Sequence, residues 1–549
     1  MTDAVVIGSG PNGLVAANLL LDAGWSVLVL EEQPTIGGAV HSDTELADGF
    51  VHDTFSAFYP LGASSPIISG LGLEDYGLRW VHAPAVLGNP MPDGRWAMLH
   101  RDPADTAAGL DADHPGDGQA WLELYGMWEK FGGSLIGALL SPFPPVKHGI
   151  AAAATIPRAG GMELLRVLAS SVRWLGTERF GGDLPGQLLA GNALHADFST
   201  EAAGSGMFGW LLCMLGQQVG FPVPEGGAGQ LTAAMARRVE ALGGEIRCGT
   251  RVDRVVVRGG RAVAVRTAAG HEIDAGKAVL ANVVAPNLYG GLLSWDDVPT
   301  TVRARMRRFE WDPATVKVDW ALSGPVPWDP GPPAAPGCVH VADSLDELTI
   351  GAAQIAAGLV PAEPFLLTGL MTTTDPTRSP AGTESMWAYT HVPREIRGDS
   401  GDDGLTGSWD ESEAERFADR MQARIERYAP GFGSRVVARR VLAPEDLHDR
   451  NSNLVGGSVN GGTAAVHQQL IFRPYPGTGR AETPIRGLYL ASSSAHPGGG
   501  VHGGPGSNAA RAALAHDRAS RVLAAPAKLR SAGRHRLTRG AASRTGDET

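Results

Sequence analysis

Residues 5–32 read VVIGSGPNGLVAANLLLDAGWSVLVLEE, and this stretch decides the fold. The run Ala4 to Ile7 is short, apolar and rich in β-branched residues, which predicts a buried parallel strand. Gly8, Gly10 and Gly13 follow it with the spacing GxGxxG. In a strand–turn–helix unit these glycines permit a tight turn, a close approach of backbone to a diphosphate, and close packing of helix on strand.

The residues that follow complete a βαβ unit. Apolar residues recur at helical spacing up to Gly24, which predicts a helix, and the run Ser26 to Leu30 predicts a second strand. That strand ends in Glu31, which follows Gly13 by 18 residues and is placed to bind a ribose hydroxyl. The sequence therefore predicts a dinucleotide site, with these binding residues: Gly8, Gly10, Pro11, Asn12, Gly13, Glu31 and Glu32.

A second glycine pair indicates which dinucleotide is bound. Gly37 and Gly38 lie six residues beyond Glu31, in the run QPTIGG. This arrangement resembles the extended fingerprint of FAD enzymes of the glutathione-reductase-like superfamily, and it implies non-covalent FAD. Many relatives, flavin amine oxidases among them, continue with arginine, but Ala39 stands here. That difference points away from ordinary amine oxidases.

Composition limits the classes of function. The 549 residues are 43% hydrophobic, enough for two or more domains with large cores. A net charge of −12 argues against general nucleic-acid binding. The three cysteines, Cys213, Cys248 and Cys338, lie far apart, which excludes a CxxC redox pair and a zinc ribbon, and we expect no metal site. Because the first strand starts at once, we expect no secretory signal and a cytoplasmic location.

The pattern along the chain predicts an interrupted FAD-binding domain. The helical, Gly/Pro-broken stretch after residue 60 reads as a cap inserted into it. Residues 202–224 are uncharged, which favours a buried helix beside a hydrophobic substrate cavity, with peripheral membrane contact as the alternative. We expect an FAD-binding domain of residues 1–60, 221–285 and 441–525, a substrate domain of 61–220 and 286–440, and a disordered basic tail of 526–549.

Further motifs support this division. Segments 245–248, 251–257, 262–267 and 271–274 alternate like the strands of a β-meander, and 277–281 predicts a buried strand. In the superfamily this block meets the adenine, which implies a contact at Val252. Near the C-terminus, a strand at 487–491 leads into a glycine-rich turn and a helix. We interpret Gly499, Gly500 and Val501 as a backbone cradle for the flavin and diphosphate.

Both ends of the chain point to one family. The crossover GFVHDTFSAFYPL at residues 49–61 and the run GLYLASSSAHPGGGVHG at 487–503 resemble phytoene-desaturase-like FAD oxidoreductases. Within these, the chain is most similar to the branch of pyridine nucleotide-disulfide oxidoreductase domain-containing proteins. The resemblance implies an α/β fold: a Rossmann-like FAD-binding domain, with a parallel sheet and a β-meander, and an interleaved α+β substrate domain.

The resemblance also implies a reaction class. We expect removal of a hydride from a mostly apolar organic molecule, of the desaturase, dehydrogenase or oxidase type, with oxygen, a quinone or another acceptor taking the electrons. A flavin amine oxidase is one alternative, and a non-catalytic flavin-binding interaction protein is another. The sequence does not specify the substrate or the oligomeric state.

Two residues are candidates for a catalytic role. Lys317 lies in the alternating strand 316–322, where a lysine of flavin amine oxidases reaches the flavin through a water, although an exposed polar face with Asp319 is the competing interpretation. His496 precedes the terminal glycine run and is the second candidate. His52 and Asp53 of the crossover are acid–base candidates or packed polar groups, and Phe55, Phe58 and Tyr59 are candidates to line the flavin pocket.

Overall fold

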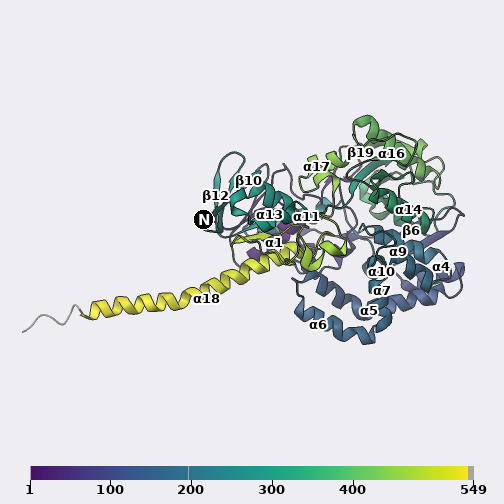
Figure 1. The fold of residues 1–549 in the computed structure, drawn as a ribbon. Helices are drawn as coiled ribbons and strands as arrows, with labels where there is room; N and C mark the ends of the chain where they lie inside the picture. The colour runs from purple at the N-terminus through teal and green to yellow at the C-terminus, as the bar shows by residue number, and fades with distance from the viewer. Residues whose placement is uncertain (1, 196, 542–549) are drawn as a thin grey trace, which may run out of the picture.

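Two seven-stranded sheets organise the computed structural model, which describes residues 2–195 and 197–541 (Figure 1). The first sheet has the order β10-β11-β12-β1-β2-β9, with β20 paired to β12. Its strands are β1 (Thr2–Ile7), β2 (Val27–Leu30), β9 (Glu245–Arg247), β10 (Val252–Arg258), β11 (Arg261–Thr267), β12 (Glu272–Ala281) and β20 (Leu488–Leu490).

The centre of the first sheet is parallel and buried. β1 pairs in parallel with β2 and with β12, while β2 pairs in parallel with β9. Helix α1 (Pro11–Asp22) connects β1 to β2, as the glycine spacing predicts, and it packs beside α11 (Gly229–Ala241) and the first turns of α18 (Gly504–Ala541). Val5 and Val6 are fully buried on opposite faces of β1, because the sheet is covered on both sides.

The second sheet has the order β19-β13-β17-β16-β14-β6-β7. Its strands are β6 (Ala85–Pro90), β7 (Trp96–Leu99), β13 (Ala314–Leu322), β14 (Pro336–Val341), β16 (Leu366–Leu370), β17 (Glu384–Val392) and β19 (Val436–Leu442). β17 lies in its middle, antiparallel to both β13 and β16. Helix α16 (Glu411–Glu426) buries Phe417 and Met421 against the apolar side chains of β13.

Helices from the first long insertion cover this second sheet. They include α4 (Pro103–Asp113), α5 (Asp117–Leu140), α6 (Val146–Thr155), α7 (Met162–Ala169), α8 (Val172–Arg179), α9 (Leu184–Leu194) and α10 (Ser205–Val219). α9 and α10 pack side by side, and Trp210 of α10 is fully buried. The uncharged stretch 202–224 therefore forms a buried helix, and across the described residues no helix is both long and apolar enough to cross a membrane.

The remaining helices connect these layers. They are α2 (Pro60–Ala63), α3 (Pro66–Ser69), α12 (Ala285–Asn287), α13 (Thr300–Met306), α14 (Leu345–Ala356), α15 (Met371–Thr374) and α17 (Pro444–Arg450). Short strands pair as β3 (Ser42–Asp43) with β4 (His52–Asp53), β5 (Trp80–Val81) with β8 (Val223–Pro224), and β15 (Leu359–Val360) with β18 (Gly398–Asp399).

The structure confirms the mixed α/β fold with a Rossmann-like unit and differs from the sequence expectations at three places. β9 belongs to the parallel sheet and not to the meander, because it pairs with β2. β12 is one continuous strand, with its first half in the meander and its second half beside β1. β6 and β7 were not expected within the helical insertion. β6 is held in the second sheet by pairing with β14, which is distant in sequence.

The expected disorder of 526–549 is corrected in part. The chain continues as helix α18 to Ala541, which projects away from the rest of the molecule in Figure 1. Residues 525–541 contain four alanines, four arginines, two leucines and one lysine, which all favour helix. Residues 542–549 lie outside the described residues. The domain boundaries stay predictions, and β19 continues past the one placed at residue 440.

Candidate functional site

A cavity of about 680 Å³ lies where β1, β2 and β12 end. This is the edge of a parallel sheet at which α/β proteins bind ligands. The glycine loop after β1 and the second glycine pair form part of its wall. The C-terminal glycine run and the loop 451–461 complete the wall, so that segments far apart in the sequence meet around one space.

The glycines between β1 and the first turn of α1 have no room for larger side chains. A Cβ on Gly13 would lie 2.1 Å from the carbonyl oxygen of Gly8, and a Cβ on Gly10 would lie 3.0 Å from Nδ2 of Asn282. Gly8 itself has a φ of +90°. Helix α1 starts at Pro11 beside the cavity with no side-chain cap, so the N–H groups of its first turn have no partner within the helix. This arrangement suits a diphosphate.

Glu31 directly follows β2 at the cavity and is 6% exposed. Its Oε2 accepts hydrogen bonds from the backbone N–H and the hydroxyl of Ser9, both at 2.7 Å, and its Oε1 accepts one from the N–H of Gln33 at 3.0 Å. These bonds orient the carboxylate, and a carboxylate has further lone pairs to accept hydroxyl donors. Glu32 beside it accepts a hydrogen bond from Ser452.

The second glycine pair lies directly over the first loop. A Cβ on Gly38 would lie 3.1 Å from the Cα of Gly10, so a larger residue would push the two loops apart. Gly37 has a φ of +115°, and a Cβ there would lie 2.5 Å from the carbonyl oxygen of Val40. Gly38 lines the cavity, whereas Gly37 forms the turn that places it.

The C-terminal glycine run closes another part of the wall. Gly500 has a φ of +115°, and its Cβ would lie 2.8 Å from Leu61. Val501 also adopts a left-handed backbone, with a φ of +54°. Beneath this run, the buried guanidinium of Arg473 donates to the carbonyl oxygens of Ser493 and Thr463, at 3.0 and 2.9 Å. Burial lowers the pKa of Arg473 to about 10, although the charge of Asp312 opposes the shift.

Most of the residues predicted to bind the cofactor line this one cavity. The lining set is Gly8, Gly10, Pro11, Asn12, Glu31, Glu32, Gly38, Val252, Gly499, Gly500 and Val501. Gly13 and Gly37 do not line it, because they hold the loops in place. Contact of these residues with a bound cofactor stays a prediction.

Several residues that line the cavity were not predicted from the sequence. These are Asn282, which follows β12, and the residues Asn451, Ser452, Asn453, Leu454, Val459, Gly461, Ser492 and Ser493. Asn282 could have been found, because the buried strand before it was recognised and strand ends at this edge carry ligand contacts. The loop 451–461 carries no local signal, since only its tertiary position brings it to the cavity.

Lys317 is buried and does not line the cavity. Its ammonium pairs with Asp319, and it lies 6.0 Å from the ring centre of Trp387. The interpretation of an exposed polar face is therefore wrong, because the crossover segment covers that face of β13 and Asp319 also pairs with Arg440 at 2.7 Å. Burial lowers the pKa of Lys317. A role at the flavin stays a prediction.

His496 is also buried outside the cavity lining. Its Nε2 lies 3.0 Å from the carbonyl oxygen of Ser141, at the end of α5, and burial lowers its pKa. The ring joins the terminal glycine run to the helical insertion. Its catalytic role likewise stays a prediction.

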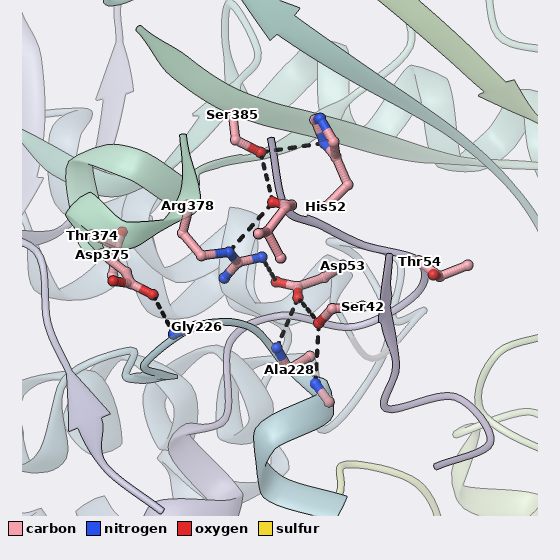
Figure 2. A network of polar contacts seen from close by, with 12 residues as sticks. Ser42, His52, Asp53, Thr54, Gly226, Ala228, Thr374, Asp375, Arg378 and Ser385 are labelled. Carbon is pink, nitrogen blue, oxygen red and sulfur yellow. Dashed lines mark hydrogen bonds and ion pairs between the residues drawn. The ribbon is translucent and has the colours of Figure 1, made fainter. Parts of the chain in front are cut away.

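The crossover pair His52 and Asp53 belongs to a buried network (Figure 2). The carboxylate of Asp53 accepts hydrogen bonds from Ser42 and from the N–H of Ala228, and its Oδ2 lies 2.7 Å from the guanidinium of Arg378. His52 lies near Ser385 of β17, with its Nδ1 3.2 Å from the hydroxyl. These contacts tie the crossover to the start of α11 and to the second sheet, which favours the packed interpretation over acid–base chemistry.

The predicted aromatic lining of the flavin pocket is not found. Phe55 packs beside Leu442 and Leu447, and Phe58 packs on Trp387 at a ring distance of 5.8 Å. Tyr59 is buried and bonds Ser56. None of the three lines the cavity.

The cavity fits an FAD molecule on its own geometry. The cradle of Gly8, Gly10 and Gly38 has no room for side chains, so its backbone can approach a diphosphate closely. Asn12 Oδ1 is buried with no hydrogen-bond partner in the described chain. Glu31 supplies a carboxylate for a ribose.

Comparison with known families agrees with this geometry. Residues 6–71 match the NAD(P)-binding Rossmann-like domain, and residues 219–507 match the FAD dependent oxidoreductase family, which covers more than half of the chain. The chain belongs to the FAD dependent oxidoreductase family. FAD is therefore its cofactor, and oxidation–reduction is its class of reaction, as the sequence predicted.

Curated relatives extend over nearly the whole chain. The chain is 28% identical to pyridine nucleotide-disulfide oxidoreductase domain-containing protein 2 of Rattus norvegicus, covering 92% of both chains. It is 26% identical to a lycopene-forming phytoene desaturase of Pseudescherichia vulneris, covering 94% of this chain and 99% of that one. The resemblance seen in the sequence motifs is thereby confirmed.

Among solved structures, the fold is similar to that of a putrescine oxidase bound to putrescine. The TM-score is 0.58, with 16% identity, and the match covers 94% of this chain and 99% of that one. At this identity the likeness concerns the fold alone.

Proposed function

We propose that this oxidoreductase removes a hydride and a proton from a mostly apolar organic molecule and leaves a double bond or an imine, with the proton released to solvent. When bound, FAD supplies the hydride acceptor. The protein's part is to hold the cofactor through the glycine cradle and Glu31, and to present the substrate in a site from which water is excluded. The observation that supports this proposal is the position of the cavity relative to the two sheets.

One part of the cavity wall adjoins the meander of the first sheet, at Val252. Another part, at Val459 and Gly461, follows directly on Ser458, which forms a β-bridge with Ala314 of β13 in the second sheet. We assign the adenine to the first part and the reacting flavin ring to the second. The ring would then face the second sheet, whose helical cover buries the apolar residues of α9 and α10.

The test is anaerobic bleaching of the purified yellow protein. Candidate apolar alkenes and amines are mixed with the enzyme, and the visible absorbance of the flavin is followed without oxygen. Bleaching by an apolar compound supports the proposal, whereas bleaching only by amines would identify a flavin amine oxidase. Re-oxidation by oxygen or by a quinone, measured separately, identifies the electron acceptor.

We also propose a cytoplasmic location with peripheral membrane contact. Helix α6 supports it, because none of its residues is buried, and Val146 and Ile150 are 64% and 67% exposed. Lys147 and Arg158 are exposed close by and can meet anionic headgroups. An apolar substrate would reach the enzyme from such a surface.

A further inference from the structure

One face of β17 carries a row of side chains whose polarity changes along the strand. Trp387, Tyr389 and His391 alternate onto this face, and we call them the β17 row. The rings of Trp387 and Tyr389 stack at 5.9 Å, and those of Tyr389 and His391 meet edge-on at 5.6 Å. Phe58 packs on Trp387. The row therefore has an apolar end at Trp387 and a polar end at His391.

At the polar end, His391 faces the carboxyl group of Asp197. Nε2 of His391 and Oδ1 of Asp197 are 3.1 Å apart, but the two atoms lack the geometry of a hydrogen bond. Neither atom has another hydrogen-bond partner among the described residues. The side chains are 9% and 2% exposed. Polar atoms buried in this way are costly unless something pairs with them.

Asp197 connects this pair to the wall of the FAD cavity. Its Oδ2 accepts a hydrogen bond of 2.7 Å from Nδ2 of Asn460. Asn460 lies between Val459 and Gly461, which both line the cavity, and its Oδ1 is 3.2 Å from where a Cβ of Gly499 would be. The polar end of the β17 row is thus one side chain away from the cavity wall next to the second sheet.

The side chains around the pair are mostly apolar, with the buried carboxyl group of Asp312 close by. Phe198, the neighbour of Asp197, stacks on Phe208 of α10 with ring centres 4.4 Å apart. Two more histidines lie close by, His195 and His340, and they share a hydrogen bond of 2.8 Å between their Nε2 atoms. Burial lowers the pKa of His195 to about 3, so this imidazole is neutral near pH 7.

Burial favours the uncharged form of both side chains. Burial raises the pKa of Asp197 well above its ordinary value, and the nearby charge of Asp312 adds to the shift. Burial lowers the pKa of His391. A protonated carboxyl group and a neutral imidazole can donate and accept hydrogen bonds, but they supply no counter-charge for a buried ion.

We propose that Asp197 and His391 bind the hydroxyl group of an otherwise apolar alcohol at the flavin end of the cavity. A hydroxyl both donates and accepts, so it satisfies the carboxyl group and the imidazole together. The apolar remainder would lie along the β17 row toward Trp387 and Phe58. The inference rests on the proposed function and names the class of its substrate. A plain hydrocarbon would leave the buried polar atoms unpaired, and an ammonium would be buried without a counter-ion.

The arrangement is not suited to a metal. Among the described residues, no group of three or more histidine, cysteine, aspartate or glutamate side chains is placed to hold a metal ion. The site is therefore assigned to an organic hydroxyl.

The experiment compares three probes of similar shape: cyclohexanol, cyclohexylamine and methylcyclohexane. Each is titrated into the FAD-loaded protein, and binding is read from the visible spectrum of the flavin and from calorimetry. We expect cyclohexanol to bind roughly tenfold more tightly than methylcyclohexane, the difference that one or two buried hydrogen bonds supply. Cyclohexylamine is expected to bind more weakly than cyclohexanol.

Variants locate the effect. Asp197→Val and His391→Leu should each weaken cyclohexanol roughly tenfold and leave methylcyclohexane unchanged. Asp197→Asn keeps a neutral hydrogen-bonding group, so its affinity for cyclohexanol should stay within about threefold of that of the unmodified protein. If Asp197→Val does not fold, this variant provides the test at residue 197. His52→Gln is the matched control. It alters a buried histidine of β4 that lies near Ser385, at the other end of β17 from His391.

Four results would overturn the proposal. They are equal affinity for cyclohexanol and methylcyclohexane, tighter binding of cyclohexylamine, no binding of any probe to yellow protein, and cyclohexanol affinity that is unchanged in both apolar variants. A failure of the proposed function gives a different result. The protein would then discriminate among the probes but never bleach with any apolar compound.

Discussion

At the scale of single residues, Gly10 has no room for a side chain at the cofactor cradle. A Cβ there would lie 3.0 Å from Nδ2 of Asn282 and would face the cavity that holds the diphosphate. We expect Gly10→Val to abolish FAD binding, so that the purified protein is colourless. The measurement is flavin absorbance per protein, with circular dichroism to show that the variant is folded.

Gly109→Ala is the matched control for that substitution, because nothing lies within 4 Å of the added Cβ in helix α4. It should keep full FAD content, since alanine favours helix over glycine by about 1 kcal/mol. Full FAD content in Gly10→Val would contradict the role assigned to the first glycine loop.

Asp43 gives the enzyme a specific dependence of stability on acid pH. Burial alone would raise the pKa of Asp43, but the hydrogen bond and charge of Arg440 lower it from 3.8 to about 2. A carboxylate whose pKa is lower in the folded state stabilises that state above pH 3.8, and this contribution is lost as the pH falls toward 2.

We therefore expect Asp43→Asn to reduce the free energy of unfolding at pH 6, with the deficit shrinking between pH 3.8 and about 2. Urea unfolding at a series of pH values measures it. If the difference in free energy of unfolding between variant and wild type stays constant down to pH 2, the asparagine destabilises the fold through its shape and not through loss of the carboxylate charge.

At the scale of elements, the ion pair of Asp53 and Arg378 fastens the crossover strand β4 to the segment that follows α15 (Figure 2). Both side chains are 0% exposed. Breaking a buried pair from one side leaves an uncompensated charge, which costs about 3–5 kcal/mol. We expect Arg378→Met to destabilise the protein by that amount, measured by urea unfolding.

The double variant Asp53→Asn with Arg378→Met should cost less than the sum of the single changes, because it leaves no unpaired charge. Additive costs would mean that the two groups act independently. This cycle also tests the packed interpretation of the crossover, since an acid–base role would not couple the two residues in unfolding.

Helix α6 and the start of α7 provide the test of membrane contact. Val146, Ile150 and Met162 are exposed, the last by 71%. We expect the wild-type protein to sediment with vesicles of mixed neutral and anionic phospholipid. Replacing all three residues by glutamine should reduce the bound fraction severalfold, because their apolar surface no longer enters the lipid.

Ile350→Gln in α14 is the control, since Ile350 is a similarly exposed apolar residue at 58% on another helix. Vesicle binding that survives the triple substitution would place the contact elsewhere or exclude it.

Some of these elements could be predicted from the sequence and others could not, for physical reasons. The first βαβ unit was predictable because the glycine spacing, the helical period and the terminal Glu31 all lie within 30 residues. β9 was misassigned because its pairing with β2 spans more than 200 residues, which no local pattern encodes. Burial of Lys317 was not expected, because alternation shows which residues share a face but not what covers that face.

The candidate site shows the same division. Each glycine of the cradle carries its own sequence signal, whereas Asn460 and Asp197 have none. Their pairing depends on how the loop 451–461 meets the segment that follows α9. Arg473 is similar, because its role comes from the carbonyl groups that fold around it.

At the scale of the whole molecule, the chain has one dinucleotide-binding unit, although Gly498, Gly500 and Gly503 repeat the GxGxxG spacing near the C-terminus. The match to an NAD(P)-binding Rossmann-like domain covers 6–71, the stretch that forms the FAD cradle. The second run, Gly498 to Gly503, opens helix α18, and no described strand follows it to carry a ribose-binding acid. Its glycines Gly499 and Gly500 face the same FAD cavity.

We therefore expect NADH and NADPH to be poor direct reductants of the bound flavin. In an anaerobic stopped-flow experiment, either nucleotide should bleach the flavin far more slowly than dithionite, the control that shows the flavin is reducible. Rapid stoichiometric reduction by one nucleotide would contradict this and would assign the terminal glycine run to a nicotinamide. Slow reduction of the flavin by NADH and by NADPH is the result expected if the organic substrate supplies the electrons as a hydride.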